Sequence, residues 1–376
     1  MTETDLAVTI QATALATMLG SAHTPHETAI YCGAATPRVF DDPEKEIAAL
    51  VSGAALHDLG WMRRVAVRGE DRFRWLSGMV TNTVNELAAN GGAWNLVLNA
   101  QGRILGDLTV WREGENLELE IAADQSEKLI EHLNHFIIMD DVELVPLGVE
   151  PVAEPGAETA VGLTGPQADD VLGRLGLPTL SEAMTATHVE WNGLDLRILR
   201  NYGALALHYE LWLPAAGLSK LWKYLHTAGA TPVGCASLDA FRIAEGIPAY
   251  GTDFSERHLP QETSQMRALH FNKGCYLGQE IVERIRSRAN VHRHLRSLEL
   301  SGPLPAGETE LTLQDGKPAG HISSAAELSL PSGSRIFALG IIREDAELSK
   351  EAFTYTAGAA TGTARILATP PTFDPS

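Results

Sequence analysis

The sequence predicts an α+β fold that ends in a small all-β domain, and three observations point to it. Strand-like and helix-like segments are mixed without the regular βαβ repeat of a doubly wound sheet. A stretch rich in Pro and Gly, Ser301–Gly307, interrupts the chain near its C-terminal end. Beyond it, apolar runs at Leu311–Leu313, Ile322 and Ile336–Ile341 are short and separated by turns such as Asp315–Gly316. That pattern is typical of a small barrel or sandwich.

Two helices and one strand are indicated in the first half of the chain. Val65–Val67 alternates apolar with small residues as a half-buried strand does, and Glu70–Val80 follows with apolar residues at helical spacing. Leu129–Ile137 reads as a second amphipathic helix that ends before Asp140–Asp141. Pro146–Gly156, rich in Pro, Gly and Glu, then predicts a joint between two parts of the chain.

A hairpin and a further helix follow from turn and capping residues. Trp94–Leu98 and Arg103–Trp111 are expected to form two strands joined by the turn Asn99–Gly102. Ser237 is placed to cap a later helix, which Gly246 would close as its C-terminal glycine.

The composition restricts the classes of protein that need to be considered. The 376 residues carry a formal net charge of −19, with 44% hydrophobic and 20% charged residues, as in a globular protein of two or three domains. This acidity argues against a nucleic-acid coat protein, so we expect no stable DNA binding. Cys32, Cys235 and Cys275 form no C-x-x-C pair, which fits a reducing compartment and predicts no metal site. No apolar run is long enough for a membrane helix. Acidic residues precede the mildly apolar stretch Ala7–Ala22, where a signal peptide would have basic ones. We therefore expect a cytoplasmic protein without membrane association.

The most unusual segment is Lys273-Gly-Cys-Tyr-Leu-Gly-Gln-Glu280. Its two glycines hold Cys275 in a short loop, and a helix beginning in the following Gln-Glu-Ile-Val run would favour the thiolate, as would Lys273. The run could also begin a strand, and Glu280 would work against the thiolate. The alternative is that Cys275 is a small buried residue, and this is the interpretation we adopt for Cys32 and Cys235.

This segment resembles the K-G-C-[FY]-x-G-Q-E signature of the YgfZ-type folate-binding proteins, relatives of the T-protein (aminomethyltransferase) of the glycine cleavage system. The similarity extends from about His57 to about Ile366. It includes the stretches Leu98–Leu105, Leu163–Pro166, Pro232–Gly234 and Arg242–Gly251.

The resemblance implies a ring-like arrangement of a T-protein-like, folate-binding α+β region in residues 25–299, in two subdomains, with a β-barrel domain in 300–368. Residues 369–376 would form a disordered tail. It further implies tetrahydrofolate, or a one-carbon derivative of it, as the cofactor, and client iron–sulfur proteins, some of them tRNA-modifying, as partners. Cys275 would be the functional thiol, held by the motif residues Lys273, Gly274, Tyr276, Gly278, Gln279 and Glu280.

Two departures separate this chain from T-proteins. Where T-proteins resemble L-N-x-x-G-G-[IV]-x-D-D at the hairpin, this chain has Gly106 and keeps only Asp107 of the acidic pair. Where they resemble R-T-G-Y-T-G-E-x-G-Y-E, the first glutamate falls on Ala206 and only Glu210 remains. Because carboxylates accept hydrogen bonds from pterin N–H groups, their loss weakens the case for transferase chemistry. An aminomethyltransferase or methyltransferase, and a carrier without catalysis, are the alternatives.

Several polar residues are candidate folate contacts, each with a structural alternative. Asp107 is equally suited to facing a ligand or solvent, and Arg242 and Glu245 are spaced for an ion pair on one helix. Trp61, Trp75 or Trp94 could stack on a pterin. The full set of candidate folate contacts is Asn99, Arg103, Asp107, Glu210, Arg242 and Tyr250.

A basic run from Arg284 to Arg296 contains five arginines and no acids in this acidic chain. The alternation at Arg284, Arg286 and Arg288 suggests an edge strand with a cationic face. Such a face would bind a polyanion, either the polyglutamate tail of a folate or RNA, or would protect a strand edge from aggregation.

Overall fold

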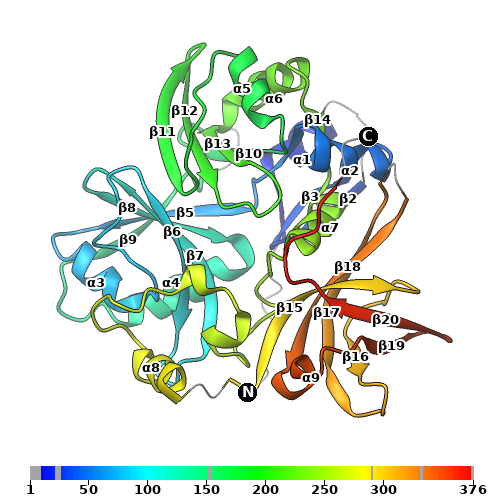
Figure 1. Ribbon diagram of the computed structural model, residues 1–376. Coiled ribbons are helices and arrows are strands. Elements are labelled where there is room, and N and C mark those ends of the chain that lie inside the picture. Colours follow the sequence, from blue (N-terminus) through cyan, green and yellow to red (C-terminus); the bar gives the residue numbers. More distant parts are fainter. Residues whose placement is uncertain (1–9, 22–26, 151–153, 289–290, 331–332, 374–376) are drawn as a thin grey trace, which may run out of the picture.

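The structure is a computed structural model, and it describes residues 10–21, 27–150, 154–288, 291–330 and 333–373. Three lobes surround the middle of the molecule, with a small three-stranded sheet at one side (Figure 1). The predicted α+β body followed by a small closed barrel is confirmed.

The first lobe is a five-stranded antiparallel sheet with two helices against it. In spatial order its strands are β6 (Gly92–Leu98), β7 (Ile104–Glu113), β8 (Asn116–Ala122), β5 (Met62–Arg68) and β9 (Glu143–Leu147). The helices are α3 (Arg72–Met79) and α4 (Ala123–His135). The predicted hairpin is therefore β6–β7, and both predicted helices form. Trp75, a candidate for pterin stacking, is instead 4% exposed in the core beneath this sheet.

The second lobe is a six-stranded sheet, antiparallel except where β14 pairs with β4. Its strands in spatial order are β11 (Thr185–Trp191), β12 (Leu194–Asn201), β13 (His208–Pro214), β10 (Glu158–Thr164), β4 (Ala55–Asp58) and β14 (Thr231–Pro232). Its core includes residues of α1 (Ala14–Ser21), α5 (Ala168–Arg174) and α6 (Leu218–Thr227).

The third lobe is a closed six-stranded barrel with the short helix α9 (Glu344–Leu348) against it. Its strands in spatial order are β15 (Arg293–Ser301), β18 (Arg335–Arg343), β17 (Pro318–Leu328), β16 (Thr309–Thr312), β19 (Phe353–Ala357) and β20 (Ala360–Ile366). The barrel thus begins at Arg293, seven residues before the expected boundary. Of the expected tail, Phe373 packs on Phe337 with ring centroids 6.1 Å apart, and residues 374–376 lie outside the described residues.

The small sheet and two helices join the lobes. The sheet has the order β1 (Gln11–Ala12), β3 (Ala34–Val39) and β2 (Glu27–Tyr31). Helix α7 (Cys235–Glu245) packs on β3, on the barrel and on α2 (Pro43–Ser52). Gly246 closes α7 at φ +77°, as predicted, but Gly234 caps its start. Ser237 lies inside the helix and donates a 2.7 Å hydrogen bond to the buried Glu46.

Candidate functional site

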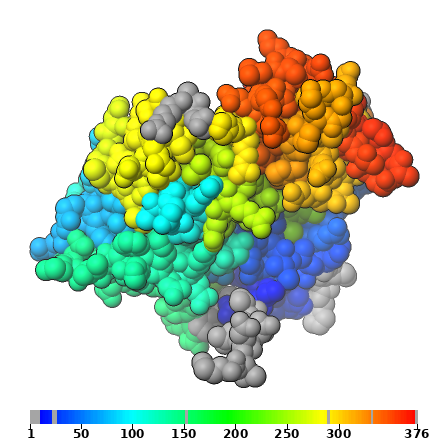
Figure 2. All heavy atoms as spheres, turned by 90° about the horizontal axis from the view of Figure 1, so that it is seen from below, coloured from blue at the N-terminus to red at the C-terminus, as the bar shows by residue number. Residues whose placement is uncertain are grey.

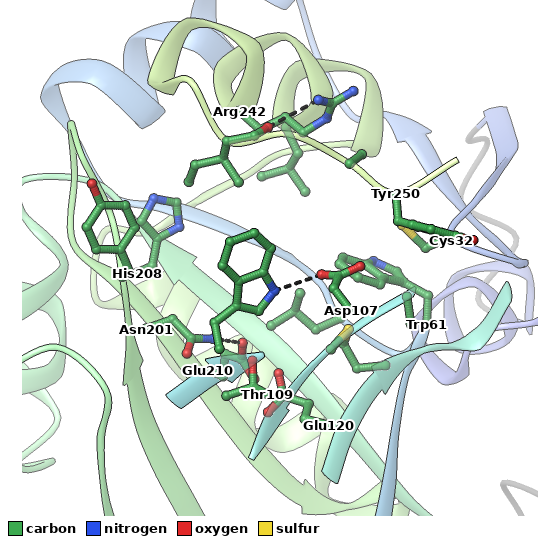
Figure 3. A pocket seen from close by; sticks show the side chains of 18 of the residues that line it. Cys32, Trp61, Asp107, Thr109, Glu120, Asn201, His208, Glu210, Arg242 and Tyr250 are labelled. Atoms are coloured by element: carbon green, nitrogen blue, oxygen red, sulfur yellow. Dashed lines mark hydrogen bonds between the residues drawn. The ribbon is translucent and has the colours of Figure 1, made fainter. Parts of the chain in front are cut away.

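A central cavity of about 320 Å³ lies where the two large sheets and α7 face one another (Figure 3). Asp107 on β7 and Glu120 on β8 come from one sheet, Glu210 on β13 from the other, and Arg242 from α7. Of the six predicted folate contacts, the cavity brings together Asp107, Glu210, Arg242 and Tyr250.

Asp107 faces the cavity and not bulk solvent. It accepts hydrogen bonds from the indole N–H of Trp94 (2.8 Å) and from the side-chain amide of Gln125 (3.1 Å). Burial raises the pKa of Asp107 above its ordinary value. The same packing explains the glycine at position 106, because a Cβ there would lie 2.7 Å from Oε1 of Gln125 and 2.9 Å from Leu129. An acidic side chain at position 106, as in T-proteins, would therefore need the space that Gln125, the hydrogen-bond partner of Asp107, occupies in this chain.

Two buried carboxyl groups, Glu120 and Glu210, lie close to each other on the cavity floor (Figure 3). Trp111 donates its indole N–H to Glu120 (2.9 Å), while Trp212 (3.2 Å) and Asn201 donate to Glu210. Burial and the neighbouring Glu210 raise the pKa of Glu120 well above its ordinary value, and burial raises the pKa of Glu210. Two like charges this close are unfavourable, so the pair disfavours ionisation of both carboxyl groups, and the larger rise of the pKa at Glu120 makes Glu210 the more readily ionised of the two.

A chain of polar contacts runs along the wall formed by the second sheet. His57 Nε2 lies 3.0 Å from Oγ1 of Thr164, which lies 3.3 Å from Nδ1 of His208. His208 Nε2 is 2.9 Å from the carboxylate of Glu245. Burial lowers the pKa of His57 to about 4, and a Cβ on Gly162 would clash with its ring at 1.9 Å. Burial acts to raise the pKa of Glu245, but the charge of His208 and its hydrogen bonds bring that pKa below its ordinary value.

Arg242 and Glu245 therefore do not pair with each other, contrary to one prediction. Arg242 binds Asp239 and Asp253 instead, each at 2.7 Å. The spacing of three residues permitted an ion pair, but His208 and the backbone amides before it compete successfully for Glu245.

Aromatic side chains cover much of the remaining wall. Trp61 and Trp94, two of the three tryptophans proposed to stack on a pterin, line the cavity. In the described part of the chain, the indole N–H of Trp61 is buried and has no acceptor. Buried donors are rarely left without partners, so this one suits an acceptor atom of a bound molecule.

Asn99 and Arg103 do not line the cavity. Oδ1 of Asn99 accepts from the backbone amides of Gln101 and Arg103, each at 3.0 Å, and so shapes the hairpin turn. Arg103 donates to the carbonyl oxygen of Arg257 at 2.9 Å. Both residues are explained by local structure.

The signature segment lies on the surface and also does not line the cavity. In Figure 2 the yellow part of the chain that carries it lies beside the orange barrel strands. Cys275 is exposed, whereas Tyr276 is buried and its backbone amide donates to the Gln279 side chain at 3.3 Å. Gly278 has φ +82°, and a Cβ there would lie 2.7 Å from the carbonyl oxygen of Asn99. The Gly278 position thus fits the segment against the hairpin turn.

Lys273 is bound within the body of the protein. Its ammonium donates to the carbonyl oxygens of Val80 (2.7 Å) and Asn82 (2.5 Å), and burial lowers its pKa to about 8. Gly274 has open space around it and Glu280 is exposed. Lys273 therefore fixes the start of the segment to the backbone at Val80 and Asn82.

The predicted cationic edge strand is wrong, because Arg284 and Arg286 lie on helix α8 (Gln279–Arg288). The alternation over five residues fits either structure, but the buried Val282 shows the helical face. Arg286 stacks on Phe271 at 4.3 Å; the side chain of Arg288 lies outside the described residues.

The described residue ranges contain no cluster of three or more His, Cys, Asp or Glu side chains placed to hold a metal ion. None of their helices combines the length and apolar character needed to cross a bilayer.

The cavity residues that sequence reasoning missed include four with ionisable side chains, His57, Glu120, His208 and Arg267. Only His57 carried a signal, since the family resemblance begins at His57-Asp-Leu. Glu120 alternates with apolar residues along β8 and therefore looks like a solvent-facing position.

Known proteins of similar sequence and structure include named transferases. A chloroplastic candidate transferase of Arabidopsis thaliana is 26% identical over 310 residues, which cover 82% of this chain and 69% of that protein. An aminomethyltransferase of Geobacillus kaustophilus is 26% identical over 332 residues, covering 84% and 88% of the two chains. The crystal structure of the glycine cleavage system aminomethyltransferase T from Bartonella henselae superimposes with a TM-score of 0.83 at 19% identity, covering 96% of this chain and 98% of that one.

The family model described as the GCVT N-terminal domain matches residues 16–273, which is more than half of the chain. That match, the closed C-terminal barrel and the fold shared with an aminomethyltransferase agree. This chain belongs to the GCVT-domain family.

Proposed function

We propose that the protein binds a tetrahydrofolate in the central cavity. The observation that carries this proposal is the carboxyl pair Glu120–Glu210 on the floor of an otherwise largely aromatic and apolar cavity. A pterin ring presents adjacent N–H donors and a flat face. An ionised Glu210 suits the donors and the tryptophans suit the face. The unpartnered indole N–H of Trp61 suits an acceptor atom of the ring.

Ligand-induced stabilisation tests this proposal directly. The melting temperature should rise with tetrahydrofolate concentration, with a gain of about 2.7 kcal/mol at a hundred times the Kd. The absence of any shift with tetrahydrofolate or its one-carbon derivatives at millimolar concentration would overturn the proposal.

The cellular role that we propose is support of iron–sulfur enzymes, with Cys275 as the functional thiol. The exposure of Cys275 within the segment Lys273–Glu280 supports this, since a purely structural cysteine is usually buried. Cys275→Ser should fold and bind folate, yet fail to restore iron–sulfur enzyme activities in cells that lack the protein. Full rescue by Cys275→Ser would contradict it.

One observation favours a transferase as the second candidate. Asp107 is half-buried beside Trp94 and has a raised pKa, which suits a group that takes or gives a proton at a folate nitrogen. Several relatives are also named aminomethyltransferases. An aminomethyltransferase would form methylenetetrahydrofolate from an aminomethyl-lipoyl donor protein. A protein that only binds folate would not.

A further inference from the structure

A second cavity of about 300 Å³ adjoins the central one and shares part of its wall. The shared residues are Tyr202, Glu245 and Arg267. The second cavity reaches the first barrel strand at Ser297 and the segment that follows β20. A single elongated molecule that passes Arg267 could therefore occupy both.

Arg267 is held rigidly in the wall between the two cavities. Its guanidinium lies 4.3 Å from the ring centroid of Trp94 and 4.2 Å from that of Tyr202. The backbone is fixed as well, because Asn82 donates to the carbonyl oxygen of Arg267 at 2.8 Å and Thr81 donates to that of Ala268 at 2.7 Å. A side chain ordered in advance loses little conformational entropy when a ligand binds.

The terminal nitrogens of this guanidinium remain free to bind a ligand. Among the described residues, the only acceptor for Arg267 is Oε1 of Gln265, which receives a 3.1 Å hydrogen bond from Nε. The nearest carboxylates are already engaged: Asp107 with Trp94 and Gln125, and Glu245 with His208. Arg267 is therefore a positive charge at the junction of the two cavities, and the N–H donors of its two terminal nitrogens are unused among the described residues.

The two cavities differ in chemistry. The central cavity combines tryptophans with carboxyl groups, which would repel an anion. Hydroxyl and amide side chains, among them Ser264, Gln265 and Ser297, line the second cavity, and Arg296 donates to Ser264 at 2.7 Å. Its single carboxylate, that of Glu245, is shared with the central cavity and already binds His208. An aromatic head in the first cavity and an anionic tail in the second match this division.

We propose that Arg267 binds a carboxylate of the glutamate tail of a tetrahydrofolate, whose pterin occupies the central cavity and whose tail leaves through the second cavity. This inference rests on the proposed function. It assigns tail recognition to Arg267 in place of the arginines of α8. Recognition is thereby directed to folates over pterins that lack the tail.

Calorimetric titration of two ligands into three proteins tests this. Tetrahydrofolate and 6-methyltetrahydropterin, which has no glutamate tail, are titrated anaerobically into the wild type, Arg267→Gln and Arg286→Gln. Arg286→Gln is the matched control, because Arg286 is also a guanidinium stacked on an aromatic ring. A charge-assisted hydrogen bond predicts that the wild type prefers the folate by roughly tenfold to a hundredfold. Arg267→Gln should lose most of this preference by weakening the folate alone, and Arg286→Gln should keep it.

The outcomes separate the two proposals. Equal affinities in the wild type, or an Arg267→Gln variant that keeps the preference or weakens both ligands alike, would overturn the role of Arg267 while leaving pterin binding intact. If neither ligand binds the wild type, the proposed function itself fails, and the role of Arg267 with it. Arg267→Lys, which keeps the charge without the planar fork, should retain part of the preference and guards against a folding defect in Arg267→Gln.

Discussion

The central cavity and the segment Lys273–Glu280 differ in how sequence relates to structure. The segment is eight consecutive residues, recognisable at once, and the fold presents its cysteine on the surface. The cavity is assembled from both large sheets and α7, with no local motif. It holds groups whose pKa values burial shifts strongly, among them His57 and Glu120. The conspicuous sequence signature and the central cavity are therefore separate places in this protein, and we expect that each can be disturbed without the other.

The largest expected effect concerns the cavity and pH. Folded His57 stays neutral down to its pKa of about 4, whereas in the unfolded chain it takes up a proton below about pH 6.5. The unfolded state thus binds more protons in this window, and stability falls as the pH drops from 6.5 to 4, by up to about 3 kcal/mol. His57→Gln should lose less stability than the wild type over this range in urea unfolding.

Comparison of variants isolates the effect of His57. Glu120 and Asp107, whose raised pKa values act in the opposite direction, are present in both proteins and cancel in the difference. Cys275→Ser should follow the wild-type curve, because the segment lies outside the cavity. If the free energies of unfolding of the wild type and His57→Gln depended on pH in the same way, His57 would not be buried as a neutral group.

The next effect compares the three thiols. Burial raises the pKa of Cys235 to about 11 and raises that of Cys32 further, so both carry far less thiolate than an unperturbed cysteine. For Cys235 the two-unit shift alone lowers the thiolate fraction roughly a hundredfold. Iodoacetamide followed by mass spectrometry should therefore label the exposed Cys275 first, and urea should abolish the difference. Similar labelling rates in the native protein would mean that the segment does not expose its thiol.

A third prediction concerns the carboxyl pair. Glu210→Gln keeps the shape of the side chain but removes the anionic acceptor, and it should weaken tetrahydrofolate binding roughly tenfold to a hundredfold in calorimetry. Glu310→Gln, an exposed change on the barrel, serves as the control. Unchanged affinity in Glu210→Gln would show that the carboxyl pair Glu120–Glu210 does not recognise tetrahydrofolate.

The smallest expected effect is that of Cys275→Ser on the same affinity. Because Cys275 does not line the cavity, the Kd for tetrahydrofolate should change by less than about twofold, as for a surface substitution. A larger loss in calorimetry would mean that segment and cavity are coupled, and the contrast between them would have to be abandoned.

Much of the fold follows from local signals, and the failures have physical causes. The β6–β7 hairpin, α3, α4 and the barrel strands are visible because apolar periodicity and turn residues agree. Helix α8 is predicted as a strand because arginines alternate with other residues over Arg284–Arg288. Five residues are too few to distinguish the two-residue repeat of a strand from the 3.6-residue repeat of a helix. The expected domain boundary at residue 300 falls inside the barrel strand β15, because its arginines and histidine conceal its apolar face.

The site was only partly predictable. Asp107 and Glu210 were found through family motifs, but Glu120 occupies a position that faces solvent in a single isolated sheet. It is buried because a second sheet packs across it. Arg267 and His208 owe their importance to partners far away in sequence, Trp94 and Glu245. Local patterns carry no information on such pairings.

The central claim is that a reduced folate occupies the cavity, and a crystal structure of the protein with tetrahydrofolate tests it most directly. We expect the pterin ring within hydrogen-bond distance of Glu210, an acceptor atom at the indole N–H of Trp61, and the glutamate tail beside Arg267. Folate bound against α8 or the Cys275 segment, with the central cavity left to solvent, would contradict it.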